Sequence, residues 1–271
     1  YSLSITFTRR NAMLFDYHVH TRYSADSRAP VIEQLRAAKK AGVTHICFTD
    51  HVDFDGVGLR PADIAARNAE IEALKGQFPD IDISFGMEFG MKDKAAYEDA
   101  YSHVKDCHMD FVIGSVHIVN GVDAYYPEYF EGRSREEAYL AYIEKDLECI
   151  RVSDFSVMGH YDFCAKHSPY AERSMSYSLA PQIFDEIFRE LISRGKAFEV
   201  NTSAWHNDAP WGLDILRRYR ELGGEYVTTG SDAHKPERVG NRLSEALDMI
   251  RAAGIPYVAT FKNMEPIMHR I

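Results

Sequence analysis

The chain has 271 residues, of which 45% are hydrophobic, and its formal net charge is −10. This length allows one large α/β barrel or two smaller domains, and the apolar content is ample for a sizeable core. The acidic balance argues against a broad nucleic-acid interface, because phosphate backbones are bound by clustered Lys and Arg. A small anionic substrate is still compatible with the negative net charge, provided that local cations make the electrostatic potential of the site positive.

The four cysteines, Cys47, Cys107, Cys149 and Cys164, are scattered and form no CxxC pair. This spacing predicts reduced core residues of a cytoplasmic protein, with neither a disulfide framework nor a zinc knuckle. No stretch approaches 18 consecutive apolar residues, so no membrane association is expected. We interpret Met13 as the natural start and residues 1–12 as an N-terminal extension outside the domain.

Short β-branched or aromatic runs alternate with amphipathic stretches along the chain. The first unit is a predicted strand over residues 14–20 and a helix over 29–42 that ends at Gly42. The next three pair strands 44–51, 81–90 and 110–117 with helices 60–78, 94–107 and 135–150. The last three pair strands 154–162, 196–203 and 225–234 with helices 181–194, 211–222 and 241–253. Residues 255–262 are expected to add a short last strand.

Seven strand-helix units without a Pro, Gly or Ser-rich linker between them predict one domain over residues 13–271. Helical crossovers force the strands to be parallel, and closure removes both edges of the sheet. The expected fold is therefore α/β, a distorted (β/α)7 barrel with a metal site at the carboxyl ends of its strands. A doubly wound open sheet is the alternative.

Polar side chains stand at the end of each predicted strand. His18 and His20 are two residues apart, so in a strand they project from the same face. The carboxyl ends of parallel strands meet at one mouth, where α/β barrels carry their sites. The residues at these ends are His18, His20, Asp26, Asp50, His51, Glu88, His117, His160, Asn201, Asp232 and His234.

A single histidine is more often a surface or hydrogen-bonded core residue than a metal ligand. Here six histidines stand at the ends of five predicted strands, so a surface or core role for all of them is a poor interpretation. Imidazole and carboxylate without thiolate suit Zn²⁺, Mn²⁺ or Fe²⁺. Nine His, Asp and Glu candidates are too many for one tetrahedral ion, which indicates two or three metals and a bridging carboxylate.

Six motifs occur in order along the chain: YHVHTRYSADS, FTDH, GMEFG, GSVH, MGHYD and GSDAH. This series resembles that of the PHP (polymerase and histidinol phosphatase) superfamily, and most closely its histidinol-phosphate phosphatases. The resemblance implies three divalent ions (Zn, Mn or Fe). It assigns one to His18, His20, Glu88 and Asp232, a second to Glu88, His117 and His160, and a third to Asp26, His51 and His234.

The resemblance also implies hydrolysis of a small phosphate monoester, L-histidinol phosphate in the first place. Water activated by metal would attack the phosphorus, and Asp232 or a metal-bound water would protonate the leaving oxygen. The alternatives are a nucleotide or sugar phosphatase, an exonuclease-like phosphoesterase, and a non-catalytic PHP scaffold. We expect a small phosphorylated substrate as partner, with neither nucleic acid nor membrane.

Members of the family commonly place arginines near the phosphate, where this chain has GHYDFCAKHSPY and EVNTSAW. Lys166 is the expected phosphate contact, although it lacks the bidentate fork of arginine, and Ser203 supplies no charge. Arg133, Arg135, Arg173 and Arg238 are loop residues that can take over this role. Asn201 is a further candidate for substrate contact. Asp53 or Asp55 is expected to meet the ammonium group of the substrate.

Overall fold

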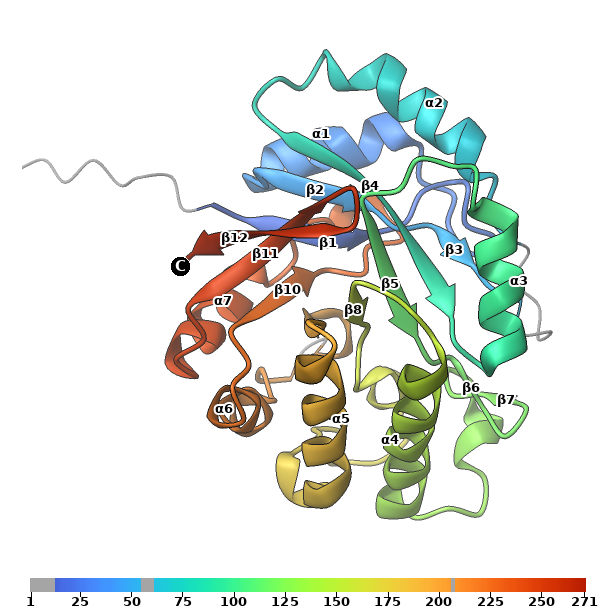
Figure 1. Ribbon diagram of the computed structural model, residues 1–271, viewed down its shortest axis with the longest axis vertical. Coiled ribbons are helices and arrows are strands. Elements are labelled where there is room, and N and C mark those ends of the chain that lie inside the picture. The colour runs from blue at the N-terminus through green and yellow to red at the C-terminus, as the bar shows by residue number, and fades with distance from the viewer. Residues whose placement is uncertain (1–12, 55–60, 206–207) are drawn as a thin grey trace, which may run out of the picture.

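Figure 1 shows the computed structural model, which describes residues 13–54, 61–205 and 208–271. The predictions made for residues 1–12 and for Asp55 fall outside these ranges. Among the described residues, no helix combines the length and the apolar composition that a membrane crossing requires.

Within the described residues, a ten-stranded sheet opens with seven parallel strands that follow one another in chain order. They are β1 (Phe15–Val19), β2 (His45–Phe48), β4 (Asp82–Gly90), β5 (Phe111–Ser115), β8 (Val157–Met158), β9 (Ala197–Asn201) and β10 (Tyr226–Gly230). The short strand β3 (His51–Val52) pairs with β4 just beyond the end of β2. The parallel order that the alternating pattern predicted is confirmed.

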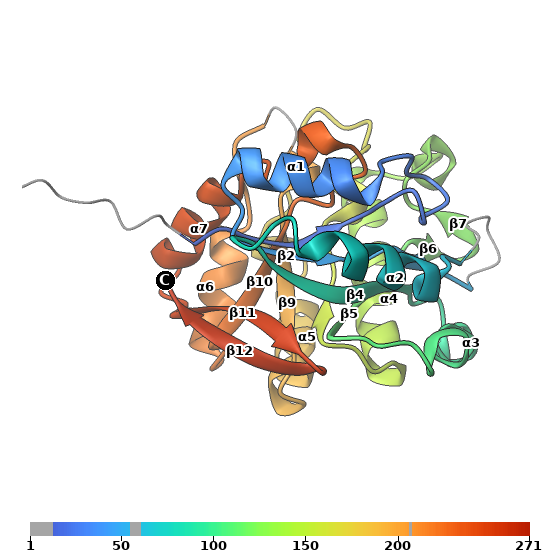
Figure 2. The same cartoon turned by 90° about the horizontal axis from the view of Figure 1, so that it is seen from above.

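The α-helices of the described residues lie around the outside of these strands (Figures 1 and 2). They are α1 (Val31–Ala41), α2 (Ile64–Lys75), α3 (Lys94–Val104), α4 (Arg135–Val152), α5 (Pro181–Ser193), α6 (Leu213–Glu221) and α7 (Leu243–Ala252).

Local sequence signals determine where these helices begin and end. Gly42 ends α1 in the left-handed region at φ 75°, and Ser134 with Glu137 forms a capping box at the start of α4. In the described connections there are five short 3₁₀ helices: η1 (Pro127–Phe130), η2 (Phe163–Ala165), η3 (Tyr177–Leu179), η4 (Ser203–Trp205) and η5 (Pro236–Arg238).

The barrel closes between β10 and β1, but only at their carboxyl ends. There Val19 bridges Ala233, and the His20 amide donates to the Ala233 carbonyl at 3.0 Å. At the amino end β10 pairs instead with β11 (Tyr257–Lys262). Because β10 has different neighbours at its two ends, the barrel is distorted, and β1 and the segment after β10 come together at the mouth.

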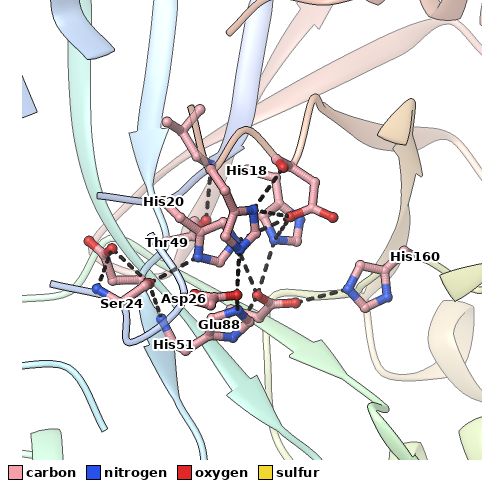
Figure 3. A network of polar contacts seen from close by, with 12 residues as sticks. His18, His20, Ser24, Asp26, Thr49, His51, Glu88 and His160 are labelled. Atoms are coloured by element: carbon pink, nitrogen blue, oxygen red, sulfur yellow. Dashed lines mark hydrogen bonds and ion pairs between the residues drawn. The ribbon is translucent and has the colours of Figure 1, made fainter. Parts of the chain in front are cut away.

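Strand β1 carries an irregularity where its first histidine stands. Its parallel register with β2 shifts between Asp16 and Val19. Bulges of this kind re-aim side chains and are frequent beside functional sites. Here His18, within the shifted segment, and His20, just after it, both point toward Glu88 (Figure 3).

Two hairpins were not predicted. Strand β12 (Glu265–Arg270) forms an antiparallel hairpin with β11, and strands β6 (Ile118–Val119) and β7 (Val122–Asp123) form another directly after β5. The signal for the second was present, because its turn is Asn120–Gly121 with φ of 53° and 80°.

The fifth predicted strand is also shorter than expected. After Met158, the backbone amide of His160 donates to the side chain of Glu199, and not to a backbone carbonyl of the neighbouring strand.

Candidate metal centre

Glu88 on β4 is the centre of a fully buried cluster of imidazole rings (Figure 3). Its Oε2 lies 3.2 Å from His18 Nε2, 3.3 Å from His20 Nε2 and 3.1 Å from His51 Nδ1. Its Oε1 lies 3.0 Å from His160 Nε2 and 3.4 Å from His117 Nε2. One carboxylate thus touches five histidines from four separate strand ends, which is the arrangement expected of a bridging ligand.

Asp232 lies on the other side of the first two histidines. Its Oδ1 is 3.3 Å from His20 Nε2 and 3.6 Å from His18 Nε2, and its Oδ2 accepts from Lys166 Nζ at 2.8 Å and Ser203 Oγ at 3.0 Å. Its backbone is in the left-handed region at φ 53°, a conformation that aspartate tolerates better than most residues. The turn after β10 therefore aims this carboxylate back into the mouth.

Asp26 joins one further histidine, His234, to the cluster and also contacts His51. Its Oδ2 is 2.9 Å from His234 Nε2 and 3.5 Å from His51 Nε2. The His20 ring stacks on that of His234 with ring centres 4.0 Å apart. All nine predicted ligands are therefore brought together.

The cluster fits divalent cations because many of its buried polar atoms lie near charged groups and yet form no hydrogen bond. These atoms are His18 Nε2, His20 Nε2, His51 Nδ1, Glu88 Oε2, His117 Nδ1, His160 Nδ1 and His234 Nε2. Buried polar atoms are normally paired, and a cation bound among them would satisfy these nitrogens and oxygens. The donors are nitrogen and oxygen without sulfur, as Zn²⁺, Mn²⁺ and Fe²⁺ accept in proteins.

Four groups of three side chains place their donor atoms within 4.8 Å of one another. One of them, His18 with His20 and Glu88, falls within the first predicted ion site. The others cut across the predicted division: His20 with His51 and His234, His18 with His160 and Asp232, and His51 with Glu88 and His117. The division into three ions accordingly stays a prediction.

Mutual electrostatics hold this cluster together in the absence of cations. Burial alone would lower the pKa of His18, but the carboxylates of Glu199, Glu88 and Asp232 raise it well above the usual value. Burial would raise the pKa of Glu88, whereas His18 and His51 bring it well below its usual range. Metal binding would replace these protons, so metal affinity is expected to rise with pH.

Asp232 is held ionised. Burial favours its neutral form, yet Lys166 and then His18 bring its pKa well below the usual value. A carboxylate in this state accepts hydrogen bonds, and it is a weak source of protons. Its predicted role in protonating the leaving oxygen is not favoured by this environment and stays a prediction.

Glu199 on β9 is a functional residue that the sequence-based reasoning missed. Its Oε1 is 2.8 Å from His18 Nδ1, and its Oε2 accepts from the His160 amide at 3.1 Å and from Asn201 Nδ2 at 3.0 Å. A carboxylate on Nδ1 fixes the tautomer that leaves Nε2 free for a cation. The available signal was alternation, since Glu199 and Asn201 share one face of a buried strand.

His20 is held by a second buried chain of hydrogen bonds. Its Nδ1 is 3.1 Å from Ser24 Oγ, and that hydroxyl donates to Asp50 Oδ1 at 2.8 Å. Asp50 also accepts from the Thr21 amide at 2.6 Å and faces the buried Arg67 at 3.5 Å. Asp50, which stands at a predicted strand end, therefore supports a ligand and lies outside the four metal-binding groups.

Two predicted substrate contacts lie behind the cluster. Asp53 is 2% exposed, and its Oδ2 lies 3.4 Å from the Nδ1 atoms of both His51 and His117. Asn201 is 3% exposed, and its Oδ1 accepts from the Ser203 amide. Neither residue lines the cavity described next, so a substrate in it would meet the histidines before Asp53 or Asn201. Their predicted contacts with substrate stay predictions that this placement does not favour.

A cavity of about 620 Å³ opens over the cluster. Lys166, Ser203 and Arg238 are among its lining residues, so the expected phosphate contact at Lys166 reaches the right place. The other three arginines are not among its lining residues. Arg133 donates to the Tyr129 carbonyl, Arg135 to that of Ser174, and Arg173 pairs with Asp208.

Comparisons with known proteins agree with this geometry. A family model described as the PHP domain matches residues 16–203. A histidinol-phosphatase from Lactococcus lactis is 31% identical over 92% of this chain and 95% of its own length. A probable histidinol-phosphatase from Clostridium acetobutylicum is 27% identical over 88% of this chain and 92% of its own.

A solved structure matches as well. It is the histidinol phosphate phosphatase of Lactococcus lactis in complex with zinc, L-histidinol and phosphate. It superposes with a TM-score of 0.85 at 30% identity, covering 94% of this chain and 98% of that one.

Proposed function

The chain belongs to the PHP domain family, and from this premise we propose that it hydrolyses L-histidinol phosphate to L-histidinol and phosphate. The observation that carries the proposal is the nine-residue cluster around Glu88 at the floor of an open cavity, with Lys166 beside it. The similarity to histidinol-phosphatases over nine-tenths of the chain supports the choice of substrate.

The cluster would hold three divalent cations, divided as the family resemblance implies. Cations bound there would lower the pKa of water toward about 7 and neutralise phosphoryl oxygens. The protein supplies fixed donors: Glu199 orients His18 and Ser24 orients His20, so both rings keep Nε2 turned toward Glu88 and Asp232. Such preorganisation places ligand atoms without rearrangement during turnover.

The substrate phosphate would meet Lys166 and Ser203. Both donate to Asp232 Oδ2, which places an ammonium and a hydroxyl side by side at the cavity wall. Lysine is a point charge, so this pair would stabilise a phosphoryl oxygen without the bidentate geometry of arginine. Because Asp232 is held ionised, our candidate for protonating the leaving oxygen is Lys166 Nζ, which carries protons at this wall.

The test begins with metal content and phosphate release. Protein loaded separately with Zn²⁺, Mn²⁺ or Fe²⁺ is assayed with L-histidinol phosphate, nucleoside and sugar monophosphates, and single-stranded DNA. We expect bound metal and the highest kcat/KM with L-histidinol phosphate. A higher value with a nucleotide, sugar phosphate or DNA would assign a different phosphoesterase activity. Protein that binds no metal and releases no phosphate would be a scaffold.

A variant separates the phosphate contact from the metal centre. Lys166→Gln is expected to raise KM for L-histidinol phosphate by about tenfold or more, because a charged hydrogen bond to phosphate is lost. Metal content should remain that of wild type, since Lys166 offers no metal donor. Lys39→Gln, the same change on the exposed face of α1, is the control and should alter neither quantity.

A further inference from the structure

We propose that the β6–β7 hairpin and the residues after it form the subsite for the leaving group, with Asp123 binding an ammonium and Tyr125 and Tyr126 packing against a flat ring. This inference rests on the proposed hydrolysis of L-histidinol phosphate and adds to it the residues that would select the alcohol. The substrate class is an amino-alcohol phosphate that carries a ring.

The hairpin is fixed relative to the metal centre. It starts directly after His117, and the Ala124 amide donates to the His117 carbonyl at 2.9 Å. Ile118 and Val119 are buried and anchor β6 in the core. A side chain at the end of β7 is therefore held at a constant distance from a predicted ligand, as a specificity residue must be.

Asp123 is the acidic residue of the cavity that has no predicted role in metal binding. Four acidic side chains line the cavity within the described ranges, and the other three are the predicted ligands Asp26, Glu88 and Asp232. The Oδ1 atom of Asp123 accepts from the Tyr125 amide at 2.8 Å, which orients its carboxylate within the turn. Because Asp53 has almost no exposed surface, Asp123 is better placed to meet an ammonium group.

The charges of the cavity wall are asymmetric. Lys235 and Arg238, from the segment after β10, line it as well and are exposed. Together with Lys166 they give the cavity a cationic wall, whereas Asp123 comes from the hairpin. A substrate with an ammonium on the carbon next to its phosphate ester would have its two charges drawn to different groups, which fixes its orientation.

Two exposed aromatic rings stand beside Asp123. Tyr125 is 41% exposed and Tyr126 is 53% exposed, and both line the cavity. Their ring centres are 5.3 Å apart, and Tyr125 packs on His167 at 4.0 Å. Adjacent exposed aromatics at a cavity mouth are typical of ligand contact, and they suit an imidazole ring.

The test compares two substrates that differ only in the amine: L-histidinol phosphate and 3-(imidazol-4-yl)propyl phosphate. Asp123→Asn removes the charge but keeps an oxygen that can accept from the Tyr125 amide. We expect the ratio of kcat/KM for the two substrates to fall by about tenfold or more, since a charge-assisted hydrogen bond is lost. Turnover of the amine-free ester should stay within twofold of wild type, which also shows that the variant is folded.

Glu128→Gln is the matched control, because it removes the same charge from exposed η1 outside the cavity lining. It should leave the ratio unchanged. Tyr126→Ala is expected to raise KM severalfold for both imidazole substrates and to leave that for methyl phosphate unchanged.

An unchanged ratio in Asp123→Asn, with wild type active on L-histidinol phosphate, would overturn this inference and leave the proposed function standing. An equal loss on both substrates would also overturn it, because Asp123 would then act on the fold. Wild type inactive on both imidazole esters would instead overturn the proposed function, and the subsite assignment with it.

Discussion

The two ends of the barrel both carry packed histidines, but only one of them has the properties of a metal centre. At the carboxyl end, rings from four strand ends converge on Glu88, and several of their buried nitrogens form no hydrogen bond. At the amino end, the rings of His45 and His269 lie 4.9 Å apart and pack on Phe15. One nitrogen of each ring is already engaged by a hydroxyl, His45 Nδ1 by that of Thr44 and His269 Nε2 by that of Thr260.

The difference teaches that histidine clustering alone does not make a metal site. Neither His45 nor His269 forms an ion pair with a carboxylate in the described part of the chain, whereas Glu88 alone contacts five rings. Burial lowers the pKa of His269, and burial with the neighbouring His269 lowers that of His45, so both rings tend to be neutral packing groups. Carboxylates and unsatisfied nitrogens are what distinguish the functional end.

The largest effect should come from Glu88→Gln. An amide cannot bridge cations as a carboxylate does, so we expect a loss of bound metal and a fall in kcat of at least about 10³-fold. The control is Glu225→Gln, the same change at an exposed position before the amino end of β10, which should leave both unchanged. Turnover of Glu88→Gln within tenfold of wild type at saturating metal would refute the bridging role.

Glu199→Gln should give the next largest effect. The His18 ring would lose the carboxylate that fixes its tautomer, and metal affinity should fall by about 10 to 100-fold. Competition with a metal chelator measures this affinity. Because the residue acts through His18, excess metal should restore most of the turnover. A fall in turnover that excess metal does not relieve would contradict the positioning role.

Gly230→Ala tests how tightly the carboxyl end is packed. A Cβ there would collide with Glu199 Oε1 and with the Cβ of His18, which cannot move without displacing the cluster. We expect a loss of about 1 to 3 kcal/mol in the free energy of unfolding of the metal-free protein, by denaturant titration.

Gly76→Ala is its control at the amino end. Gly76 has φ −61° and open space around it, so alanine there should be neutral or stabilise by about 0.4 to 1 kcal/mol. Equal effects of the two substitutions would show that the carboxyl end is not specially constrained.

His269→Gln should have the smallest effect. Loss of its 2.7 Å contact with Thr260 Oγ1 should cost about 1 kcal/mol of stability and leave metal content and activity unchanged. Because the folded pKa of His269 is lowered, wild type should lose stability as pH falls through the unfolded value near 6.5. The variant should lose less between pH 7 and pH 5, and an unaltered slope would contradict the burial argument.

The sequence determined the order of the elements and the side chains that meet around Glu88. Alternating strand and helix patterns forced a parallel sheet, so polar residues at strand ends had to meet at one mouth. The turn at Asn120–Gly121 and the buried acid Glu199 also left signals, in a turn dipeptide and in strand alternation, that the reasoning did not use. The sequence signal for the hairpin of β11 and β12 was weaker, because only β11 has a continuous apolar run.

Only the tertiary structure decided what each polar residue faces. Three polar residues stand at or just past strand ends as the predicted ligands do, yet they lie behind the histidine rings: Asp50, Asp53 and Asn201. A shift of one residue in register, or one turn of chain, is enough to turn a side chain from one face of a strand to the other. Distances between donors from strands far apart in the sequence likewise depend on how the barrel closes, and here β1 meets the segment after β10 only at the carboxyl end. Local patterns determine elements and their order, whereas packing between distant segments determines the site.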